Sequence, residues 1–439
     1  MTNHRFLDRL TSAELVVRTG RVRRILPTFI EADGPAAPRG ALCRIATDGA
    51  PGEAYAKIVS VNPDSVILVP FDEARTFSGA RVEACSDFGL TPTGDAFLGR
   101  AVDGLARPLD GGGAVRADRF ASLTGVQSTP LERVSPTQVF ETGLRAIDGL
   151  LTLGEGQRVG VFAASGVGKT TLMTQIAKQA RFDRAVVCLV GERGREVEAF
   201  WTEGLSTEAR ARATLVAATS DQTAALRVRA SELALALAEC WREQGLHVLL
   251  VLDSVTRLAM ALRELGLAAG EPPTVRAYTP SVFSTIPRLV ERCGGRRGGG
   301  AITSIMTVLS ETDEVDDPIS EMLKSLLDGH IILSRELSEQ GHYPAIDIPR
   351  SLSRLATRLV TPEHQTWSRA AIAALAAHES ARTLIESGLY VKGANREIDR
   401  AVELRPVLLA FLRQGQDEHA AFDAIRNGLA AAVSGGGVS

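Results

Sequence analysis

The chain has 439 residues, of which 45% are hydrophobic and 23% charged, and its formal net charge at pH 7 is −3. This length exceeds a single simple core, so it predicts two or three domains with the composition of a soluble globular protein. The near-neutral charge and an aromatic content of only 5% disfavour a nucleic-acid-binding surface.

The cysteines and the apolar runs predict a cytoplasmic protein. Five cysteines are scattered without metal-ligand spacing, which favours reduced thiols. The first residues contain no apolar run long enough for a signal peptide. No stretch of about 18 apolar residues occurs that would span a bilayer.

The first predicted domain is a small β-barrel over residues 20–90. Residues 1–19 precede it as a separate segment, for which we favour a frayed terminus over a helix. Brief β-type runs separated by turn residues are typical of a small barrel. These runs cover residues 22–25, 41–45, 54–61 and 65–70.

A parallel α/β domain is predicted over residues 91–354. The stretch from 87 to 135, at the junction with the barrel, is rich in Gly, Pro and Asp, and we expect a linker with turns there. From about residue 140 onward, apolar strand-like runs alternate with amphipathic helices, which predicts βαβ units. Residues 355–439 are rich in Ala, Leu, Arg and Glu without strand signals, so they predict a helical C-terminal domain.

One low-complexity patch, from Gly294 to Gly300, contains two arginines among five glycines. Such a patch could bind RNA. Because it is single and short, we favour a mobile loop between a helix and a strand.

The most informative motif reads Ala-Ala-Ser-Gly-Val-Gly-Lys-Thr-Thr over residues 163–171, between an apolar run and a helical run. A strand, a small-residue loop and a helix form a cradle whose backbone N–H groups and helix dipole bind phosphates. The strict pattern has glycine where Ala163 stands, and an ordinary turn with an exposed lysine is the alternative. The predicted cradle residues are Ser165, Gly166, Val167, Gly168, Lys169, Thr170 and Thr171.

Lys169, Thr170 and Asp253 are the residues expected to meet ATP and Mg²⁺. Lys169 brings a compact positive charge to the β- and γ-phosphates, and Thr170 offers a hydroxyl to Mg²⁺. Asp253 ends an apolar run, which places it at the carboxyl edge of the sheet, where ligands bind. Its carboxylate suits Mg²⁺, and the alternative is a simple cap on the following helix.

Glu192 and Arg193 follow another apolar strand, so they reach the same edge of the predicted sheet. A carboxylate near the γ-phosphate orients and polarises the attacking water. The adjacent guanidinium stabilises charge on the transferred group. A charged surface turn is the alternative interpretation of this pair.

Seven further runs carry a resemblance: 191–196, 253–257, 266–273, 278–283, 326–330, 333–337 and 342–347. Read in order, they resemble the type III protein-export ATPases of flagella and injectisomes. That family is similar to the catalytic β subunit of rotary F-type ATP synthases. The likeness extends from about Gly20 to Arg413 and implies a RecA-like P-loop core between an N-terminal β-barrel and a C-terminal helical domain.

The resemblance implies a role for each residue that matches the family's motifs. Lys169 and Thr170 match the phosphate and Mg²⁺ positions. Asp253 matches the second metal carboxylate. Glu192 matches the catalytic carboxylate, with Arg193 beside it.

Three more matches complete the expected site. Arg257 matches an arginine near the nucleotide, and Tyr343 is similar to an aromatic residue that packs on adenine. Arg354 resembles an arginine finger, which in such rings reaches the nucleotide of the neighbouring subunit. The alternatives are a helix-surface arginine, a core tyrosine and a surface arginine in an ordinary salt bridge.

The resemblance also implies partners and a location. We expect ATP hydrolysis in a homo-oligomeric ring of six subunits, peripheral to a membrane export gate at the inner face of the cytoplasmic membrane. The implied partners are a central stalk, stator-like regulatory proteins, export substrates and their chaperones, and not nucleic acid. The acidic stretch 311–317 is either a solvated loop or, in the family's arrangement, a surface that faces a basic stalk.

Flagellar export is favoured over the injectisome because Ser165-Gly166-Val167-Gly168 is similar to flagellar members, although Ala164 is similar to injectisome members. The alternative function is the catalytic β-type subunit of a proton-translocating rotary ATPase. The acidic Asp-Glu-Leu-Ser-Glu-Glu-Asp lever of such subunits does not occur in this sequence. Glu192 disfavours a non-catalytic nucleotide-binding subunit, and the low aromatic content and acidic balance disfavour an RNA helicase.

Overall fold

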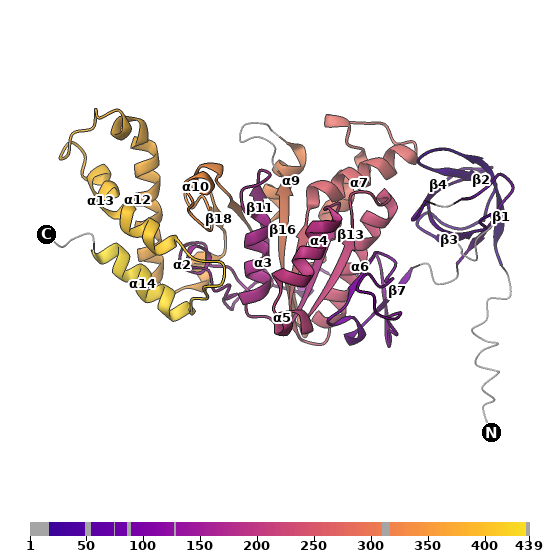
Figure 1. The fold of residues 1–439 in the computed structure, drawn as a ribbon, viewed down its shortest axis with the longest axis horizontal. Coiled ribbons are helices and arrows are strands. Elements are labelled where there is room, and N and C mark those ends of the chain that lie inside the picture. The colour runs from indigo at the N-terminus through magenta and orange to yellow at the C-terminus, as the bar shows by residue number, and fades with distance from the viewer. Residues whose placement is uncertain are drawn as a thin grey trace, which may run out of the picture.

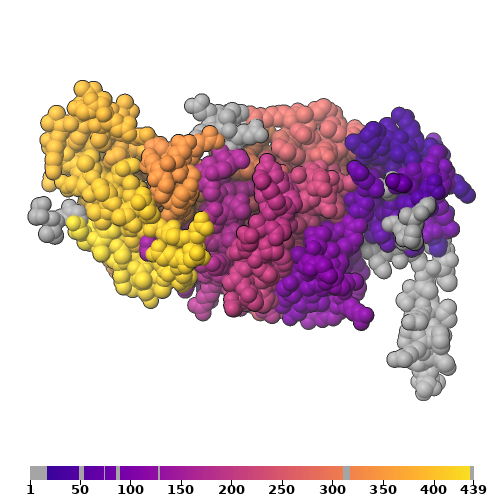
Figure 2. Space-filling model, in the orientation of Figure 1, coloured from indigo at the N-terminus to yellow at the C-terminus, as the bar shows by residue number. Residues whose placement is uncertain are grey.

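The computed structural model describes residues 17–48, 54–73, 75–85, 89–126, 129–309 and 317–435. Three parts follow one another along the long axis: an N-terminal barrel, a central α/β layer and a group of C-terminal helices (Figure 1). The space-filling view shows the same succession, with the central part between the two ends (Figure 2). The predictions for residues 1–16 and for 311–316 lie outside the described residues.

The N-terminal part is a closed β-barrel, as predicted. Its strands follow the order β1-β2-β5-β4-β3-β6 around the barrel, and each neighbouring pair is antiparallel. Small and branched side chains such as Ala56, Ile58 and Leu68 fill the interior, because a small barrel leaves room only for side chains. The strands are β1 (Thr19–Ile25), β2 (Ile30–Ala32), β3 (Leu42–Ile45), β4 (Ala54–Val61), β5 (Val66–Pro70) and β6 (Arg81–Ala84).

The central part is a mostly parallel sheet, which confirms the predicted α/β core. Its strands lie in the order β18-β17-β11-β16-β14-β12-β13-β8, and only the β17–β18 pair in this series is antiparallel. The strands are β8 (Ala101–Val102), β11 (Arg158–Ala163), β12 (Arg184–Val190), β13 (Ala213–Ala218), β14 (His247–Asp253), β16 (Ala301–Leu309), β17 (Gly329–Ile332) and β18 (Leu352–Ser353).

Helices cover both faces of this sheet, so its strands are apolar throughout. Along β12, Val187 and Leu189 face the same core as α3, whereas Val186 and Cys188 pack with α6 and α7 on the other side. The helices are α3 (Lys169–Gln179), α4 (Gly194–Ala199), α5 (Thr207–Ala211), α6 (Ala224–Arg242), α7 (Val255–Ala268), α8 (Pro280–Glu291), α9 (Pro318–Leu326) and α10 (Arg335–Glu339).

The stretch expected to be a linker contains more structure than predicted. Strands β7 (Leu90–Thr93) and β9 (Arg119–Ser122) form a two-stranded antiparallel sheet, and β8 between them joins the central sheet beside β13. A two-residue edge strand leaves almost no periodic signal, so its glycine-rich surroundings conceal it in the sequence.

The prediction of a loop for the arginine–glycine patch is wrong for residues 294–296, whereas residues 297–299 form a turn before β16. Residues Gly294–Arg296 form β15, which pairs with β10 (Arg133–Val134) and with β16. The glycines permit close backbone approach: a Cβ on Gly300 would lie 1.9 Å from the carbonyl oxygen of Leu246. The patch therefore serves the tight packing of three chain segments.

The C-terminal part is helical, as predicted, and consists of α12 (Pro362–Glu386), α13 (Arg396–Leu412) and α14 (Phe422–Ser434). These helices pack on one another and on α2 (Arg145–Leu150), which precedes the core sheet. Among the helices of the described ranges, none has the length and apolar character needed to cross a bilayer.

Candidate functional site

The predicted phosphate cradle connects the buried strand β11 to α3. Gly166 and Gly168 have φ values of 82° and 96°, which glycine adopts without steric cost. Lys169 is the first residue of α3. The backbone N–H groups of Lys169 and its neighbours therefore face the loop at the positive end of the helix. Ala163 and Ala164 do not have positive φ values, which explains why alanine fits where the strict pattern has glycine.

Lys169, Glu192 and Asp253 converge at the carboxyl edge of the sheet, although they are far apart in the sequence. The Lys169 Nζ atom lies 2.5 Å from Asp253 Oδ1 and 3.4 Å from Glu192 Oε1, and all three side chains are buried. Thr307 Oγ1 donates to the same Asp253 Oδ1 at 2.6 Å. Thr307 was not predicted, because a threonine inside an apolar strand gives no functional signal.

Glu192 is held against its neighbours rather than exposed on a turn. Burial raises the pKa of its carboxyl, and the Lys169 ammonium opposes this shift. Arg257 Nη2 lies 3.4 Å from Glu192 Oε2, and Arg257 Nη1 donates to the carbonyl of Gly191. Arg257 therefore lies in the cluster, at the start of α7, one turn beyond Asp253.

Arg193 lies outside this cluster. Its side chain is 67% exposed and Nη1 lies 3.1 Å from Oε1 of Glu196 on α4. Glu196 in turn shares a hydrogen bond with the side chain of Glu192, which adds to the raised pKa of the Glu192 carboxyl. Arg193 is thus one contact removed from Glu192.

Thr170 and Thr171 line a cavity of about 540 Å³ on the outer side of α3. Its other walls come from Glu196 on α4, from the turn that follows α4, and from residues Gln416 and Asp417 between α13 and α14. This C-terminal segment was not predicted as part of the site.

The segment after α13 is fastened to α3 by polar contacts. Gln175 Nε2 donates to the carbonyl of Gly415 at 3.0 Å, and Lys178 Nζ lies 2.5 Å from Asp417 Oδ1. The backbone N–H of Gln414 donates to the carbonyl of Tyr343 at 2.8 Å. The C-terminal part thus contacts both the cradle helix and the predicted adenine residue.

Tyr343 lies beside the cradle, as its predicted role requires. A Cβ added to Gly168 would be 3.5 Å from Cε1 of the Tyr343 ring. The side chain is 41% exposed, and its hydroxyl bonds to Ser338. An exposed aromatic ring next to a phosphate cradle is a surface on which a base can stack, which a core tyrosine is not.

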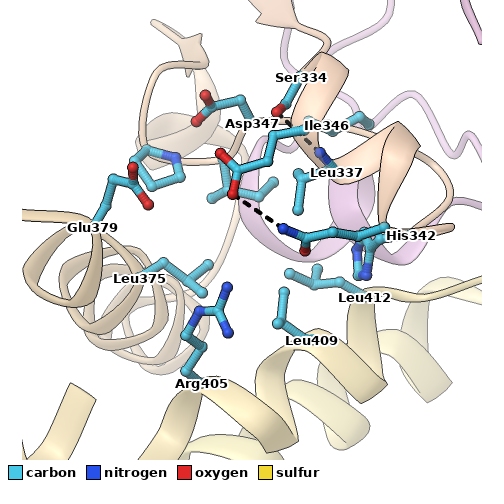
Figure 3. Close-up of a pocket in the computed structure, with 14 residues that line it drawn as sticks. Ser334, Leu337, His342, Ile346, Asp347, Leu375, Glu379, Arg405, Leu409 and Leu412 are labelled. Carbon is cyan, nitrogen blue, oxygen red and sulfur yellow. Dashed lines mark hydrogen bonds between the residues drawn. The ribbon is translucent and has the colours of Figure 1, made fainter. Parts of the chain in front are cut away.

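A smaller cavity of about 100 Å³ lies where the core meets α12 and α13. Figure 3 shows that Leu375 and Glu379 of α12 and Arg405 and Leu409 of α13 face the segment that contains His342. Burial lowers the pKa of the His342 imidazole, as do Arg413 and Arg405. This cavity contains no predicted site residue and marks the joint between the core and the C-terminal helices.

The structure does not bring Arg354 to the cradle of its own chain. Arg354 is exposed and follows the edge strand β18, and its backbone N–H donates to the carbonyl of Asp328 at 3.0 Å. Asp328 pairs with Arg158, the first residue of β11, whereas the cradle follows the last residue of that strand. At about 3.3 Å per residue the two ends of β11 are about 16 Å apart, beyond the reach of one arginine side chain.

The residues at the carboxyl edge of the sheet offer the kind of oxygen ligands that a magnesium ion prefers. Asp253 offers carboxylate oxygens and Thr170 an exposed hydroxyl, and Mg²⁺ prefers a small number of such oxygen ligands together with substrate phosphates. Among the described residues no cluster of three His, Cys, Asp or Glu side chains is placed to hold a metal ion.

The fold and the cradle together define a P-loop nucleotide-binding protein. Comparison with protein families agrees: residues 143–353 match the ATP synthase alpha/beta family, nucleotide-binding domain, and residues 360–431 match the T3SS EscN ATPase C-terminal domain.

Individual relatives match over nearly the whole chain. The chain is 40% identical over 422 residues to the flagellum-specific ATP synthase of Bacillus subtilis (strain 168), covering 96% of this chain and 96% of that protein. It is 44% identical to the flagellum-specific ATP synthase of Salmonella typhimurium (strain LT2), covering 92% and 91%. It is 40% identical to the type 3 secretion system ATPase of Xanthomonas euvesicatoria, covering 92% of both.

A solved structure of the assembled ATPase EscN, from the enteropathogenic E. coli type III secretion system, superposes with a TM-score of 0.89 at 40% identity. It covers 94% of this chain and 100% of that chain. The chain therefore belongs to the type III secretion and flagellar export ATPases of the ATP synthase alpha/beta family. It is an ATPase that energises this kind of export, which confirms the predicted family, fold class and enzyme class.

Proposed function

We propose that the chain hydrolyses ATP in a ring of six identical subunits, at sites that each need two neighbours. The observation that supports this is the position of Arg354 near the amino end of β11, whereas its own cradle follows the carboxyl end of that strand. In a closed ring with head-to-tail contacts, one surface of each subunit meets a different surface of the next subunit. Arg354 then meets the triphosphate on the neighbour, as the resemblance implies for an arginine finger.

Within one subunit, the cradle residues and Lys169 bind the phosphates. The backbone N–H groups of residues 165–171 and the end of α3 accept the anion, and the Lys169 ammonium turns from Asp253 and Glu192 to the β- and γ-phosphates. Tyr343 stacks on the base.

Glu192 orients the attacking water and receives its proton. Its carboxylate oxygens are held by Lys169 and Arg257, and its raised pKa makes it a better proton acceptor than an exposed glutamate. Arg257 and Arg193, together with the neighbour's Arg354, stabilise the charge on the transferred group.

Mg²⁺ is proposed to bind between Thr170, Asp253 and the phosphates. When bound, it neutralises charge on the phosphate oxygens. Asp253 is oriented for this by the hydroxyl of Thr307, which donates to one of its two carboxylate oxygens.

The proposed partners follow from the relatives. One related structure shows assembled EscN in complex with its central stalk EscO, and it covers 94% of this chain with a TM-score of 0.86. We propose the same kind of stalk for this protein, together with stator-like regulators, export substrates and chaperones, at the cytoplasmic side of a membrane export gate. Flagellar export remains our preferred branch, because of Ser165-Gly166-Val167-Gly168.

The division of the chain into an N-terminal segment (1–19), a barrel domain (20–90), an ATPase domain (91–354) and a helical domain (355–439) is also a proposal. The C-terminal match to the EscN ATPase domain favours export over the rotary β-type subunit that was the alternative function.

The dependence of activity on assembly tests this function. We expect the ATPase rate per subunit to rise with protein concentration in parallel with ring formation, measured by light scattering on the same samples. Protein that remains monomeric at high concentration while hydrolysing ATP at the full rate would contradict the shared site.

A further inference from the structure

Arg354 follows a very short piece of regular structure. Strand β18 has two residues and pairs with β17 only through Gly329↔Ser353 and His330↔Leu352. A residue that must reach across a subunit interface has to be held to within a fraction of an ångström. Two strand pairs at a sheet edge do not supply this, so other contacts must fix the backbone before Arg354.

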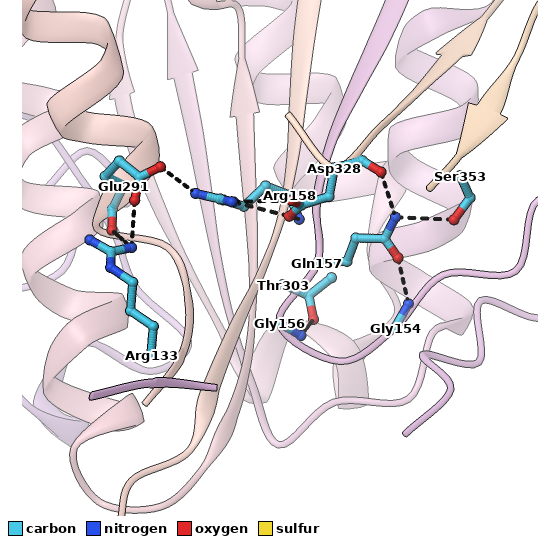
Figure 4. Close-up of polar contacts among 9 residues, drawn as sticks. All are labelled: Arg133, Gly154, Gly156, Gln157, Arg158, Glu291, Thr303, Asp328 and Ser353. Atoms are coloured by element: carbon cyan, nitrogen blue, oxygen red, sulfur yellow. Dashed lines mark hydrogen bonds and ion pairs between the residues drawn. The ribbon is translucent and has the colours of Figure 1, made fainter. Parts of the chain in front are cut away.

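Gln157 supplies the first of these contacts. It is fully buried, and its amide group has a hydrogen bond on each side (Figure 4). Nε2 donates to Ser353 Oγ at 3.1 Å and to the carbonyl of Asp328 at 3.3 Å, while Oε1 accepts from the N–H of Gly154 at 2.8 Å. The same Asp328 carbonyl accepts the backbone N–H of Arg354.

Arg158 supplies the second contact. Its guanidinium and its backbone N–H all donate to the carboxylate of Asp328, at 3.0 to 3.1 Å. Nη1 lies 2.7 Å from Glu291, which also pairs with Arg133 at 2.6 Å (Figure 4). Bidentate charged contacts of this kind fix geometry as well as contribute energy. Arg158 therefore holds the carboxylate of Asp328, while Gln157 holds its backbone carbonyl.

The two contacts come from consecutive residues: Gln157 directly precedes β11 and Arg158 is its first residue, and the phosphate cradle follows the end of this strand. One rigid strand thus links the cradle of a subunit to the backbone of the arginine that the subunit lends to its neighbour.

We infer that Gln157 is a positioning residue for Arg354: its side-chain amide holds Ser353 and Asp328 so that the guanidinium of Arg354 meets the neighbour's nucleotide. This inference rests on the proposed action of Arg354 across the interface. If Gln157 only stabilised the fold of its own chain, its loss would impair the cradle of the same subunit. If it positions Arg354, its loss impairs ATP hydrolysis at the site of the neighbouring subunit.

The test uses Gln157→Met, which keeps the volume of the side chain and removes its hydrogen bonds. We expect kcat for ATP hydrolysis to fall about 10²-fold, the loss that accompanies a misplacement of about 1 Å. The affinity for ATP and the extent of ring assembly should remain those of the natural protein. Gln138→Met, at an exposed position, is the matched control and should be fully active.

Mixing of subunits then distinguishes the two roles. In a 1:1 mixture of Gln157→Met and Glu192→Gln, about a quarter of head-to-tail interfaces combine a natural Glu192 with a well-positioned Arg354. We expect this mixture to be clearly more active than the average of its two components. Arg354→Ala mixed with Glu192→Gln serves as the reference pair.

Each outcome decides the matter. Recovery of ATPase activity in both mixtures supports the inference. Recovery in the reference pair alone shows that Gln157 serves its own chain, which overturns the inference and leaves the proposed function intact. Recovery in neither overturns the proposed function and the inference together.

A second pair of variants guards against misfolding of Gln157→Met. Ser353→Ala removes one of the two acceptors of the Gln157 amide, together with the bond that the Ser353 hydroxyl donates to the carbonyl of Thr152, whereas Ser353→Thr keeps a hydroxyl. We expect Ser353→Ala to lower kcat and to be rescued by mixing with Glu192→Gln, and Ser353→Thr to retain activity. Equal activity of Ser353→Ala and the natural protein would contradict the positioning role.

Discussion

The Lys169 ammonium lies 2.5 Å from Asp253 Oδ1 at the carboxyl edge of the sheet, with Glu192 at 3.4 Å on its other side. One buried cation therefore lies between two buried carboxylates, neither of which is more than 6% exposed, and the Arg257 guanidinium supplies a second positive charge 3.4 Å from Glu192. A bound triphosphate competes with both carboxylates for the same ammonium.

Lys169→Ala should abolish nucleotide binding. Without the ammonium, Arg257 alone opposes the two carboxylates of Glu192 and Asp253, so excess negative charge faces an anionic ligand. The phosphates also lose the lysine of the cradle. Calorimetric titration with ADP and ATP measures the effect. Lys392→Ala, at a position 81% exposed, is the control, and retained affinity in Lys169→Ala would refute the cradle's role.

Glu192→Gln should bind ATP normally and lose about 10²–10⁴-fold in kcat, the usual contribution of a general base. The amide keeps the size of the side chain but cannot take a proton from water. ATPase assays with nucleotide-binding measurements on the same preparation give both quantities. Hydrolysis at the natural rate would remove Glu192 from this role.

The pH dependence offers an independent check on Glu192. Burial raises the pKa of its carboxyl above the ordinary value of 4.5, and only the ionised form accepts a proton. The acid limb of kcat/KM reports on the free enzyme, so activity should decline as the pH falls through a midpoint above 4.5. Asp253→Asn removes one negative neighbour that raises this pKa and should shift any residual activity toward lower pH.

Tyr343→Ala should weaken ATP binding by about 1–3 kcal/mol, the range for stacking of one base on an aromatic ring. Tyr343→Phe keeps the ring and loses only the hydroxyl contact to Ser338, so its affinity should be close to the natural value. Comparison of Kd for ATP and for inorganic triphosphate locates the effect on the base. Equal losses for both ligands would place Tyr343 against the phosphates instead.

The stability of the core should fall below neutral pH because of His247. Burial lowers the pKa of its imidazole to about 4, against 6.5 for an exposed histidine. The unfolded chain then binds an additional proton between these two values, so the stabilising contribution is complete above pH 6.5 and is lost as the pH falls toward 4. The difference is on the order of 3 kcal/mol.

His247→Gln tests this contribution, because glutamine does not titrate. The difference between the urea-denaturation midpoints of the natural protein and the variant should shrink as the pH is lowered from 7 to 4.5. A difference that stays constant with pH would show that His247 has the same pKa in both states.

The sequence allowed much of the fold and part of the site to be predicted, for identifiable physical reasons. Glu192 and Asp253 end continuous apolar runs, so strand polarity alone places them at one edge of a parallel sheet. Lys169 lies in a motif whose spacing dictates its backbone conformation. These signals are local, and the structure brings the three residues together as local signals would suggest.

The unpredicted contacts depend on long-range packing. Gln157 and Ser353 are 196 residues apart, and Gln175 and Gly415 are 240 apart. No periodicity or motif connects such positions, because their proximity follows from sheet order and from the return of the C-terminal helices. The same reason explains why the sequence could suggest Arg354 as a finger but could not show that it lies at the opposite edge from its own cradle.

The shared site is tested by mixing two inactive variants, Arg354→Ala and Glu192→Gln, and measuring ATP hydrolysis. Each variant alone should assemble; Arg354→Ala should lose about 10³–10⁵-fold in rate, the range for arginine fingers. The 1:1 mixture should regain activity, because some interfaces unite the natural Glu192 of one subunit with the natural Arg354 of its neighbour. A mixture no more active than the average of the two separate variants would contradict a nucleotide site completed by the adjacent subunit.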